Sequence, residues 1–246
     1  QWILSRLQHV KIEVEKHLAD YRLDLMSQAL YEFVWHDYCD WYLELSKPLL
    51  ENSKTKEGCE ATLFKVLSET LVLLHPIIPF ITEEIFDQSQ KLLSKSDDKL
   101  ISQSFPEAEK ELINDDAETE INWLKKFILG IRKIRGEMNI SPGKLLPCYI
   151  KDFSTKDKAY IDRNKSILFT LAKLDSIELL SLNDEETESA IALVGEMKIL
   201  IPLAGLIDKG AEQDRLHKEI EKLVELKSQF SAKLNNTKFI NGAPKT

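Results

Sequence analysis

Apolar residues recur at helical spacing through more than half of this chain, and that spacing constrains the fold more than any other feature. Near the start, Ile3, Leu7, Val10, Val14 and Leu18 follow one another at steps of three and four residues. Such steps place the side chains on one face of an amphipathic helix. The 246 residues include only 8 glycines and 8 prolines, which is typical of long helices rather than of a turn-rich fold. The sequence therefore predicts a mainly α-helical protein.

The first 140 residues are expected to form a helical bundle. Proline marks two of the helix ends, because the residue before a proline is pushed out of the helical conformation. We expect these ends at Lys47-Pro48 and near His75-Pro76. The expected elements are helices over 1–19, 23–47 and 59–74, a fourth helix through Ile81, Ile85 and Phe86, a polar loop over 94–120, and a fifth helix over 121–138.

The pattern changes after residue 140. Ser141-Pro142-Gly143 is turn chemistry, and the apolar runs that follow are short, as in strands. We expect strands over 145–150, 177–182, 190–194 and 197–201, with a hairpin turn at Gly195-Glu196 and a helix over 154–174 opened by a capping box. A long charged helix over 208–235 carries Leu216, Ile220, Leu223, Phe230 and Leu234 at coiled-coil spacing.

Three parts follow from this pattern. They are a helical bundle over 1–140, a small α/β unit over 141–204, and a C-terminal coiled-coil helix over 205–246. The coiled-coil stripe needs a partner, which a neighbouring segment or a second chain could supply.

Charge and cysteine content limit the possible classes of protein. The net charge is -8, which argues weakly against a nucleic-acid partner for the chain as a whole. Two segments are nevertheless basic, 121–150 and 205–246, and a polyanion could bind there. The three cysteines lie far apart without a C-x-x-C pair, so we expect no disulfide or zinc ribbon and a cytoplasmic location. No apolar run is long enough to span a membrane.

The stretch "LYEFVWHDYCDWYLELSKPLL", residues 30–50, combines aromatic residues with His36, Cys39 and Asp40. Its composition would suit a Cys/His hydrolase or a metal site. The apolar steps from Leu30 to Leu49 instead indicate one packed helical face, and no second His/Cys cluster supplies further metal ligands. We expect no catalytic residue and no metal ligand here.

A second stretch, "GIRKIRGEMNISPGK" at 130–144, carries Arg132, Lys133, Arg135 and Lys144. These cations could bind phosphates, or they could be a solvated face that complements a helix C-terminus. Spacing alone leaves both interpretations open. No glycine-rich phosphate loop and no H-x-G-H motif occurs, so the sequence predicts no ATP site.

Five stretches, in order, carry a family resemblance. They are "WILSRLQ", "LYEFVWHDYCDWYLELSKP", "LLHPIIPFITEEIF", "IRKIRGEMNISPGK" and "IPLAGLIDKGAEQDRLHKEIEKL". Together they resemble the C-terminal part of the valyl-tRNA synthetases, which are class I aminoacyl-tRNA synthetases, over residues 2–240. The resemblance implies a fragment of a longer enzyme that lacks the nucleotide-binding and editing domains.

The resemblance implies a tRNA-recognition module without catalytic residues of its own. The expected partners are valine tRNA and the catalytic and editing domains of the same polypeptide, in a monomer without a membrane. The expected anticodon-binding residues are Arg6, Lys16, Arg22, Leu23, Glu83, Glu84, Arg132, Arg135 and Lys144, and the expected elbow-binding residues are Arg215, Lys218 and Lys222. No cofactor is expected in this fragment, whereas the full enzyme would use ATP and magnesium.

Two alternatives from other classes stay open at this point. One is a helical scaffold or oligomerisation module without tRNA specificity, built on the helix over 208–235. The other is a small hydrolase built on His36 and Cys39.

Overall fold

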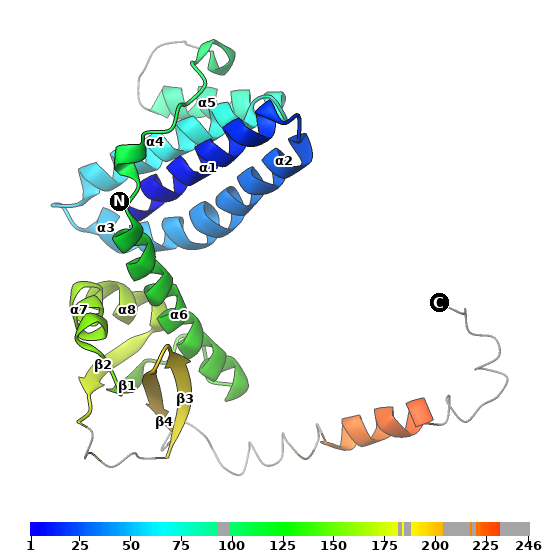
Figure 1. The fold of residues 1–246 in the computed structure, drawn as a ribbon. Helices are drawn as coiled ribbons and strands as arrows, with labels where there is room; N and C mark the ends of the chain where they lie inside the picture. Colours follow the sequence, from blue (N-terminus) through cyan, green and yellow to red (C-terminus); the bar gives the residue numbers. More distant parts are fainter. Residues whose placement is uncertain (93–98, 182–183, 185–187, 204–216, 218–219, 232–246) are drawn as a thin grey trace.

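A computed structural model describes residues 1–92, 99–181, 184, 188–203, 217 and 220–231. A bundle of helices forms one part, and a small sheet with two helices forms another (Figure 1). The long helix α6 runs from the first part to the second. The predicted class, a helical bundle followed by a small α/β unit, is confirmed.

Helix α1 (Trp2–Ala19) is the centre of the bundle. The predicted stripe is buried at Ile3, Leu7, Val10 and Val14, and α1 contacts α2, α4 and α6 through this and neighbouring positions. Each buried aliphatic side chain of this kind stabilises the fold by about 1.5–3 kcal/mol relative to exposure. The spacing of the apolar residues therefore determines which face of α1 lies inside.

The second predicted helix is present but longer and less regular than expected. It consists of α2 (Leu23–Glu32), a π-helix η1 (Phe33–Tyr42) and α3 (Leu43–Glu51). The predicted end at Lys47 is wrong, because Pro48 lies inside α3. A proline this close to a helix end removes one hydrogen bond without stopping the last turn. The wide turns of η1 pack Tyr38 and Trp41 against the core.

The next two helices meet at the corner made by the two prolines. Helix α4 (Lys56–Leu74) ends where predicted, and α5 (Pro79–Leu92) begins with a proline, whose missing N–H costs nothing there. His75 Nδ1 lies 2.9 Å from the Oγ1 of Thr82, which is itself buried. Two short 3-10 turns follow, η2 (Leu100–Ser102) and η3 (Lys110–Leu112).

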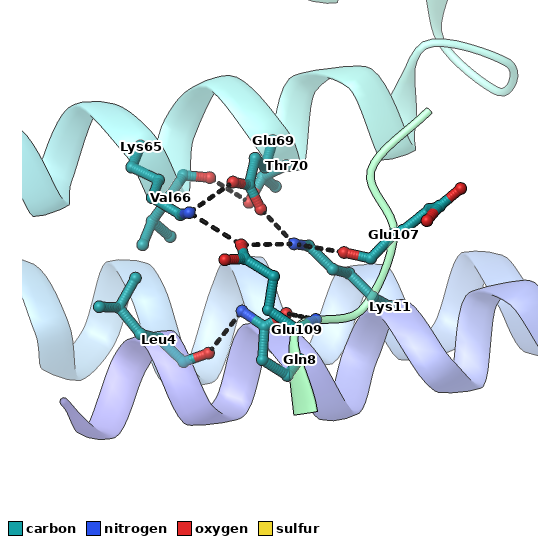
Figure 2. A network of polar contacts seen from close by, with 9 residues as sticks. All are labelled: Leu4, Gln8, Lys11, Lys65, Val66, Glu69, Thr70, Glu107 and Glu109. Atoms are coloured by element: carbon teal, nitrogen blue, oxygen red, sulfur yellow. Dashed lines mark hydrogen bonds and ion pairs between the residues drawn. The ribbon is translucent and has the colours of Figure 1, made fainter. Parts of the chain in front are cut away.

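A partly buried polar network holds the segment around η3 against α1 and α4 (Figure 2). The Lys11 ammonium, with a side chain 2% exposed, lies 2.5 Å from Glu69 Oε2 and donates to Glu107 O at 3.0 Å. Gln8 Oε1 accepts from Glu109 N at 2.9 Å, and Lys65 Nζ pairs with Glu109 Oε1 at 2.9 Å. These contacts hold an otherwise irregular segment against two helices.

Helix α6 (Asp115–Glu137) begins six residues before the predicted start at residue 121. The Asn114 side chain caps it by accepting from Ala117 N at 2.8 Å. Its first turn contains Asp115, Asp116 and Glu118. Acidic residues stabilise a helix N-terminus, but they stand where the periodic apolar residues used to predict the helix would be. The prediction of a loop up to residue 120 is therefore wrong at its C-terminal end.

The sheet has four strands in the order β2-β1-β4-β3. They are β1 (Leu146–Lys151), β2 (Leu174–Leu179), β3 (Ser189–Val194) and β4 (Met197–Pro202). Strands β1 and β2 are parallel, and the other pairs are antiparallel. The hairpin at Gly195 is confirmed, with φ 64 at the glycine. Strand β2 starts three residues earlier than predicted, because Leu174 already pairs with Leu146. Two polar residues follow Leu174 and interrupt the apolar run from which the strand was predicted.

The helix predicted over 154–174 is split into α7 (Thr155–Arg163) and α8 (Lys165–Ala172). The capping box of Ser154 and Asp157 is present as predicted. Asn164 separates the two helices and donates to Glu120 Oε1 at 2.6 Å. This tertiary contact with α6 is the physical reason for the break, and nothing in the local sequence pattern indicates it.

Residues 220–231 are helical, and their apolar side chains, including Ile220, Leu223 and Phe230, are exposed. Most of the rest of the predicted coiled-coil helix, with Leu216 and Leu234, lies outside the described residues. Helix α6 contacts both the bundle and the sheet, so the predicted domain boundary at residue 140 stays a prediction. In the described part of the chain, no helix is both long and apolar enough to cross a membrane.

Candidate nucleic-acid interface

The connection between α1 and α2 presents a tyrosine to solvent. Arg22 N donates to His17 O at 2.8 Å and Tyr21 N to Leu18 O at 3.1 Å, which closes the helix end with Tyr21 at φ 55. Glycine is the usual residue there, because a side chain in this conformation costs about 1–2 kcal/mol. Tyr21 is 91% exposed. A strained residue with an exposed aromatic ring points to a functional position.

The corner between α4 and α5 presents a second aromatic ring. Phe80 is 90% exposed, and Ile77, Ile78 and Ile81 beside it are exposed as well. The Thr82 hydroxyl donates to the Ile78 carbonyl at 2.9 Å, which holds the corner in place. Large apolar side chains that gather on a surface usually mark a binding site.

These two features lie at the same end of the bundle (Figure 1). Helices α1 and α4 run in the same direction in Figure 1, and Lys11 of α1 pairs with Glu69 of α4. Beyond this pair α1 continues for about 12 Å and α4 for about 8 Å. We call the exposed apolar residues there the bundle-end patch. Its members are Leu18, Tyr21, Leu23, Ile77, Ile78, Phe80 and Ile81.

Sequence reasoning identified Leu23 of this patch but missed Tyr21 and Phe80. Tyr21 lies in the predicted helix break, and Phe80 follows the second proline of "HPIIPF". An aromatic residue directly at a helix break was the available signal.

Two predicted cations flank the bundle-end patch. Lys16 is exposed in the last turn of α1. Arg22 donates two hydrogen bonds to Asp24, at 2.9 and 2.7 Å. The bond from Arg22 lowers the pKa of Asp24 to about 2, and the same bond raises the pKa of Arg22. Because this pair is exposed, it is weak, and Arg22 can turn toward an anionic ligand at little cost.

The two predicted glutamates differ in their surroundings. Glu83 Oε1 accepts from Leu100 N at 3.3 Å and so holds the η2 turn. Glu84 is exposed, and its Oε1 accepts from Gln88 Nε2 at 2.8 Å. Of the two, Glu84 has the carboxylate that faces solvent.

Arg6 does not lie at the bundle end. It is about 20 Å along α1 from Tyr21, and its side chain pairs with Asp37 at 2.9 Å and Glu118 at 3.7 Å. Burial opposes its charge, but the hydrogen bond to Asp37 prevails and the pKa of Arg6 is raised. Lys125 joins the cluster at 3.0 Å from Asp37. These contacts give Arg6 a structural part in joining α1, η1 and α6.

Arg132, Arg135 and Lys144 lie near the C-terminal end of α6, at the sheet rather than at the bundle end. Arg135 is 7% exposed, and burial lowers its pKa. Arg132 is exposed, with its guanidinium 5.8 Å from the Trp41 ring, and Lys144 is exposed in the loop before β1.

Of the predicted elbow-binding residues, only Lys222 is described. It is exposed on the helix over 220–231. Arg215 and Lys218 lie outside the described residues, so the structure does not place them.

The hydrolase alternative gains no support from the geometry. His36 Nδ1 lies 3.4 Å from Asp40 Oδ2, and no hydrogen bond joins it to Cys39 among the described contacts. Cys39 is exposed, and partial burial together with Asp40 raises the pKa of its thiol, whereas a nucleophilic cysteine needs a lowered pKa. Within the described ranges, no group of three or more His, Cys, Asp or Glu residues could hold a metal ion.

Comparison with known proteins matches residues 1–150 to the family described as the anticodon-binding domain of tRNA ligase. Among similar proteins are two from Legionella pneumophila, strains Lens and Paris, named valine–tRNA ligase. Each is 46% identical over 248 aligned residues, which cover 99% of this chain and 27% of the relative. The chain thus spans about a quarter of the length of the curated relatives it matches.

Proposed function

The chain belongs to the family of anticodon-binding domains of tRNA ligases, and on this premise we propose that its bundle-end patch binds the anticodon loop of valine tRNA. The observation that carries the proposal is the pair of exposed rings, Tyr21 and Phe80, at one end of the bundle. The choice of valine tRNA rests on the similarity to valine–tRNA ligases.

The chemistry of the patch suits an unpaired RNA loop. Loop bases are bound by splaying them out and stacking them on planar side chains, and Tyr21 and Phe80 offer such faces. Lys16 and Arg22 are positioned beside the patch for backbone phosphates. Glu84 offers a carboxylate that can accept from a base edge. Stacking contributes about 1–3 kcal/mol per base and needs no particular base, so specificity comes from the polar groups.

The rest of the proposal concerns the whole protein. We place ATP- and magnesium-dependent aminoacylation, and editing, in domains of the same polypeptide outside this sequence. The whole protein would act as a monomer in the cytoplasm. The terminal helix, with Arg215, Lys218 and Lys222, would reach the tRNA elbow.

A binding titration with matched variants tests the proposal. Filter binding at fixed salt compares valine tRNA with the same tRNA carrying a replaced anticodon. We expect the unmodified chain to prefer the natural anticodon. Tyr21→Ala and Phe80→Ala should each weaken binding of valine tRNA about 5- to 100-fold, as expected for the removal of one stacked ring. Tyr31→Ala is the control, because Tyr31 of α2 is also exposed but stacks on Trp35 of η1.

Equal affinity for both tRNAs would contradict the assignment of the anticodon loop to this domain. Equal losses of affinity in all three variants would contradict the assignment to the bundle-end patch.

The scaffold alternative keeps one supporting observation. Ile220, Leu223 and Val224 form an exposed apolar strip on the terminal helix, which a second chain could cover. Sedimentation at two protein concentrations distinguishes the scaffold from the tRNA-binding domain. A mass that doubles with concentration, together with no tRNA preference, would favour the scaffold.

A further inference from the structure

A basic groove lies between the C-terminal ends of α6 and α8. Its volume is about 540 Å³, which lies within the range of roughly 300–1,000 Å³ that is typical of ligand sites. We call it the α6–α8 groove. Nine residues line it, all of them described: Arg132, Arg135, Gly136, Asn139, Ile140, Pro142, Leu171, Ala172 and Lys173.

The charged residues that line the α6–α8 groove are all positive. Three of its lining residues are cationic and none is acidic. In the described part of the chain, no carboxylate lies within ion-pair distance of Arg132 or Lys173. Two other cations of α6 are paired, Lys125 with Asp37 and Lys133 with Glu137. Two cations left without a counter-charge beside one groove raise the local positive potential.

Arg135 joins the two walls of the α6–α8 groove, so its guanidinium is bonded to the protein rather than directed at a ligand. Its guanidinium donates to Ser141 O at 3.1 Å on one wall, and to Ala172 O at 3.1 Å and Lys173 O at 2.8 Å on the other. The last carbonyls of a helix carry partial negative charge and repel anions. By bonding to these carbonyls at the end of α8, Arg135 both joins the walls and removes that repulsion.

Lys173 occupies a backbone conformation that does not suit it. It caps α8 at φ 53, where glycine is the usual residue. Its carbonyl is held by Arg135 and by Leu146 N at 3.1 Å, so the backbone is fixed while the side chain is exposed. A lysine kept at a position that favours glycine is a local outlier of the kind found at functional sites.

We propose that the α6–α8 groove binds backbone phosphates of an RNA stem through Arg132 and Lys173, with Arg135 as a positioning residue. The inference rests on the proposed function, because the RNA is the one whose loop occupies the bundle-end patch. It adds a second contact region at the sheet end of α6. Phosphate contacts of this kind fix register and orientation and carry no sequence information.

The test uses two variants and a matched control in the 246-residue chain. Lys173→Gly removes the charge and supplies the residue that the backbone favours. Arg132→Gln removes the second charge and keeps a polar side chain. Lys133→Gln is the control, because Lys133 is on the same helix but pairs with Glu137 at 3.8 Å. Fluorescence anisotropy gives the Kd for valine tRNA, and for the same tRNA with a replaced anticodon, between about 50 and 200 mM salt.

Each groove variant should weaken the binding of both tRNAs by the same factor, about 3- to 10-fold at low salt. The slope of log K against log salt should fall by about 0.7–0.9 for each phosphate that the variant no longer neutralises. Lys173→Gly should keep or raise the urea midpoint while it weakens binding, which a purely structural role would not produce. Lys133→Gln should leave the slope unchanged.

Unchanged Kd and slope in both groove variants, with the anticodon preference of the unmodified chain intact, would overturn this inference alone. Loss of the anticodon preference in the groove variants would also overturn it, since a backbone contact acts equally on both tRNAs. No anticodon preference in the unmodified chain would instead count against the proposed function.

Discussion

The buried pair of Lys11 and Glu69 provides a direct test of how the bundle holds its irregular segment. Glu69→Met removes the carboxylate but keeps a side chain of similar length. Lys11, with a side chain 2% exposed, would then keep only Glu107 O at 3.0 Å and Glu109 Oε1 at 4.0 Å. Because the ammonium is almost fully buried, water cannot replace the missing carboxylate.

The size of the effect follows from that geometry. Removing one partner of a buried ion pair costs about 3–5 kcal/mol. The interactions that remain with Glu107 and Glu109 place the expected loss of stability near the lower limit, at about 3 kcal/mol. The double variant Lys11→Met/Glu69→Met removes both charges, and replacing a buried pair by apolar residues is often neutral. We therefore expect it to be more stable than Glu69→Met alone, by about 2 kcal/mol.

Urea unfolding followed by circular dichroism measures these differences, with the free energy of unfolding compared at constant m-value. The control is Lys133→Met, which breaks an exposed pair with Glu137 and should cost no more than about 0.5 kcal/mol. A loss of stability below about 1 kcal/mol for Glu69→Met would refute the reasoning. A double variant as unstable as the sum of the two single variants would refute it as well.

Three further predictions concern packing and ionisation. Gly130→Ala should lower stability, because its Cβ would lie 3.0 Å from Ala192 Cβ in β3. Gly136→Ala meets nothing within 4 Å and should raise stability by about 0.5–1 kcal/mol. The urea midpoint of each variant shows whether stability falls or rises. In the native protein an alkylating reagent should modify the exposed Cys39 and leave the buried Cys148 unmodified, and mass spectrometry that finds Cys148 labelled first would contradict the fold. Burial raises the pKa of Cys148 to about 12, from 9. The stabilisation from keeping this thiol protonated is present below pH 9 and disappears as pH rises toward 12, so Cys148→Ala should reduce alkaline unfolding in a circular-dichroism titration.

The helices were predictable where burial and sequence period coincide. In α1 the apolar stripe is also the buried face, and the predicted helix agrees with the observed one. In α6 the first turn carries acidic capping residues in place of apolar ones, so the predicted start was late. The break at Asn164 depends on Glu120, 44 residues away. An interaction of that kind leaves no trace in local spacing.

The candidate site was less predictable than the fold, because the charge of a residue does not determine whether its side chain is exposed to a ligand. Arg6 and Arg135 were predicted as RNA contacts from the family resemblance, yet the structure surrounds both with intramolecular partners. Tyr21 and Phe80 lacked the charge that drew attention in the sequence, and their exposure became visible only in three dimensions. Lys173 is similar, since its unusual φ has no signature in a single sequence.

Ion pairing within the fold therefore decides where an anion can bind to this acidic chain. With a net charge of -8, the chain as a whole repels RNA at long range. Binding must therefore depend on cationic and aromatic side chains at particular places on the surface. Carboxylates neutralise the buried Lys11 and the half-buried Arg6 and Lys125 in ion pairs. Lys16 at the bundle end and Arg132 and Lys173 in the α6–α8 groove are exposed and keep their charge available. RNA bound at both places would lose affinity steeply with salt. The folded chain would lose little stability over the same range, because its exposed pairs contribute little and the pair of Lys11 is shielded by burial.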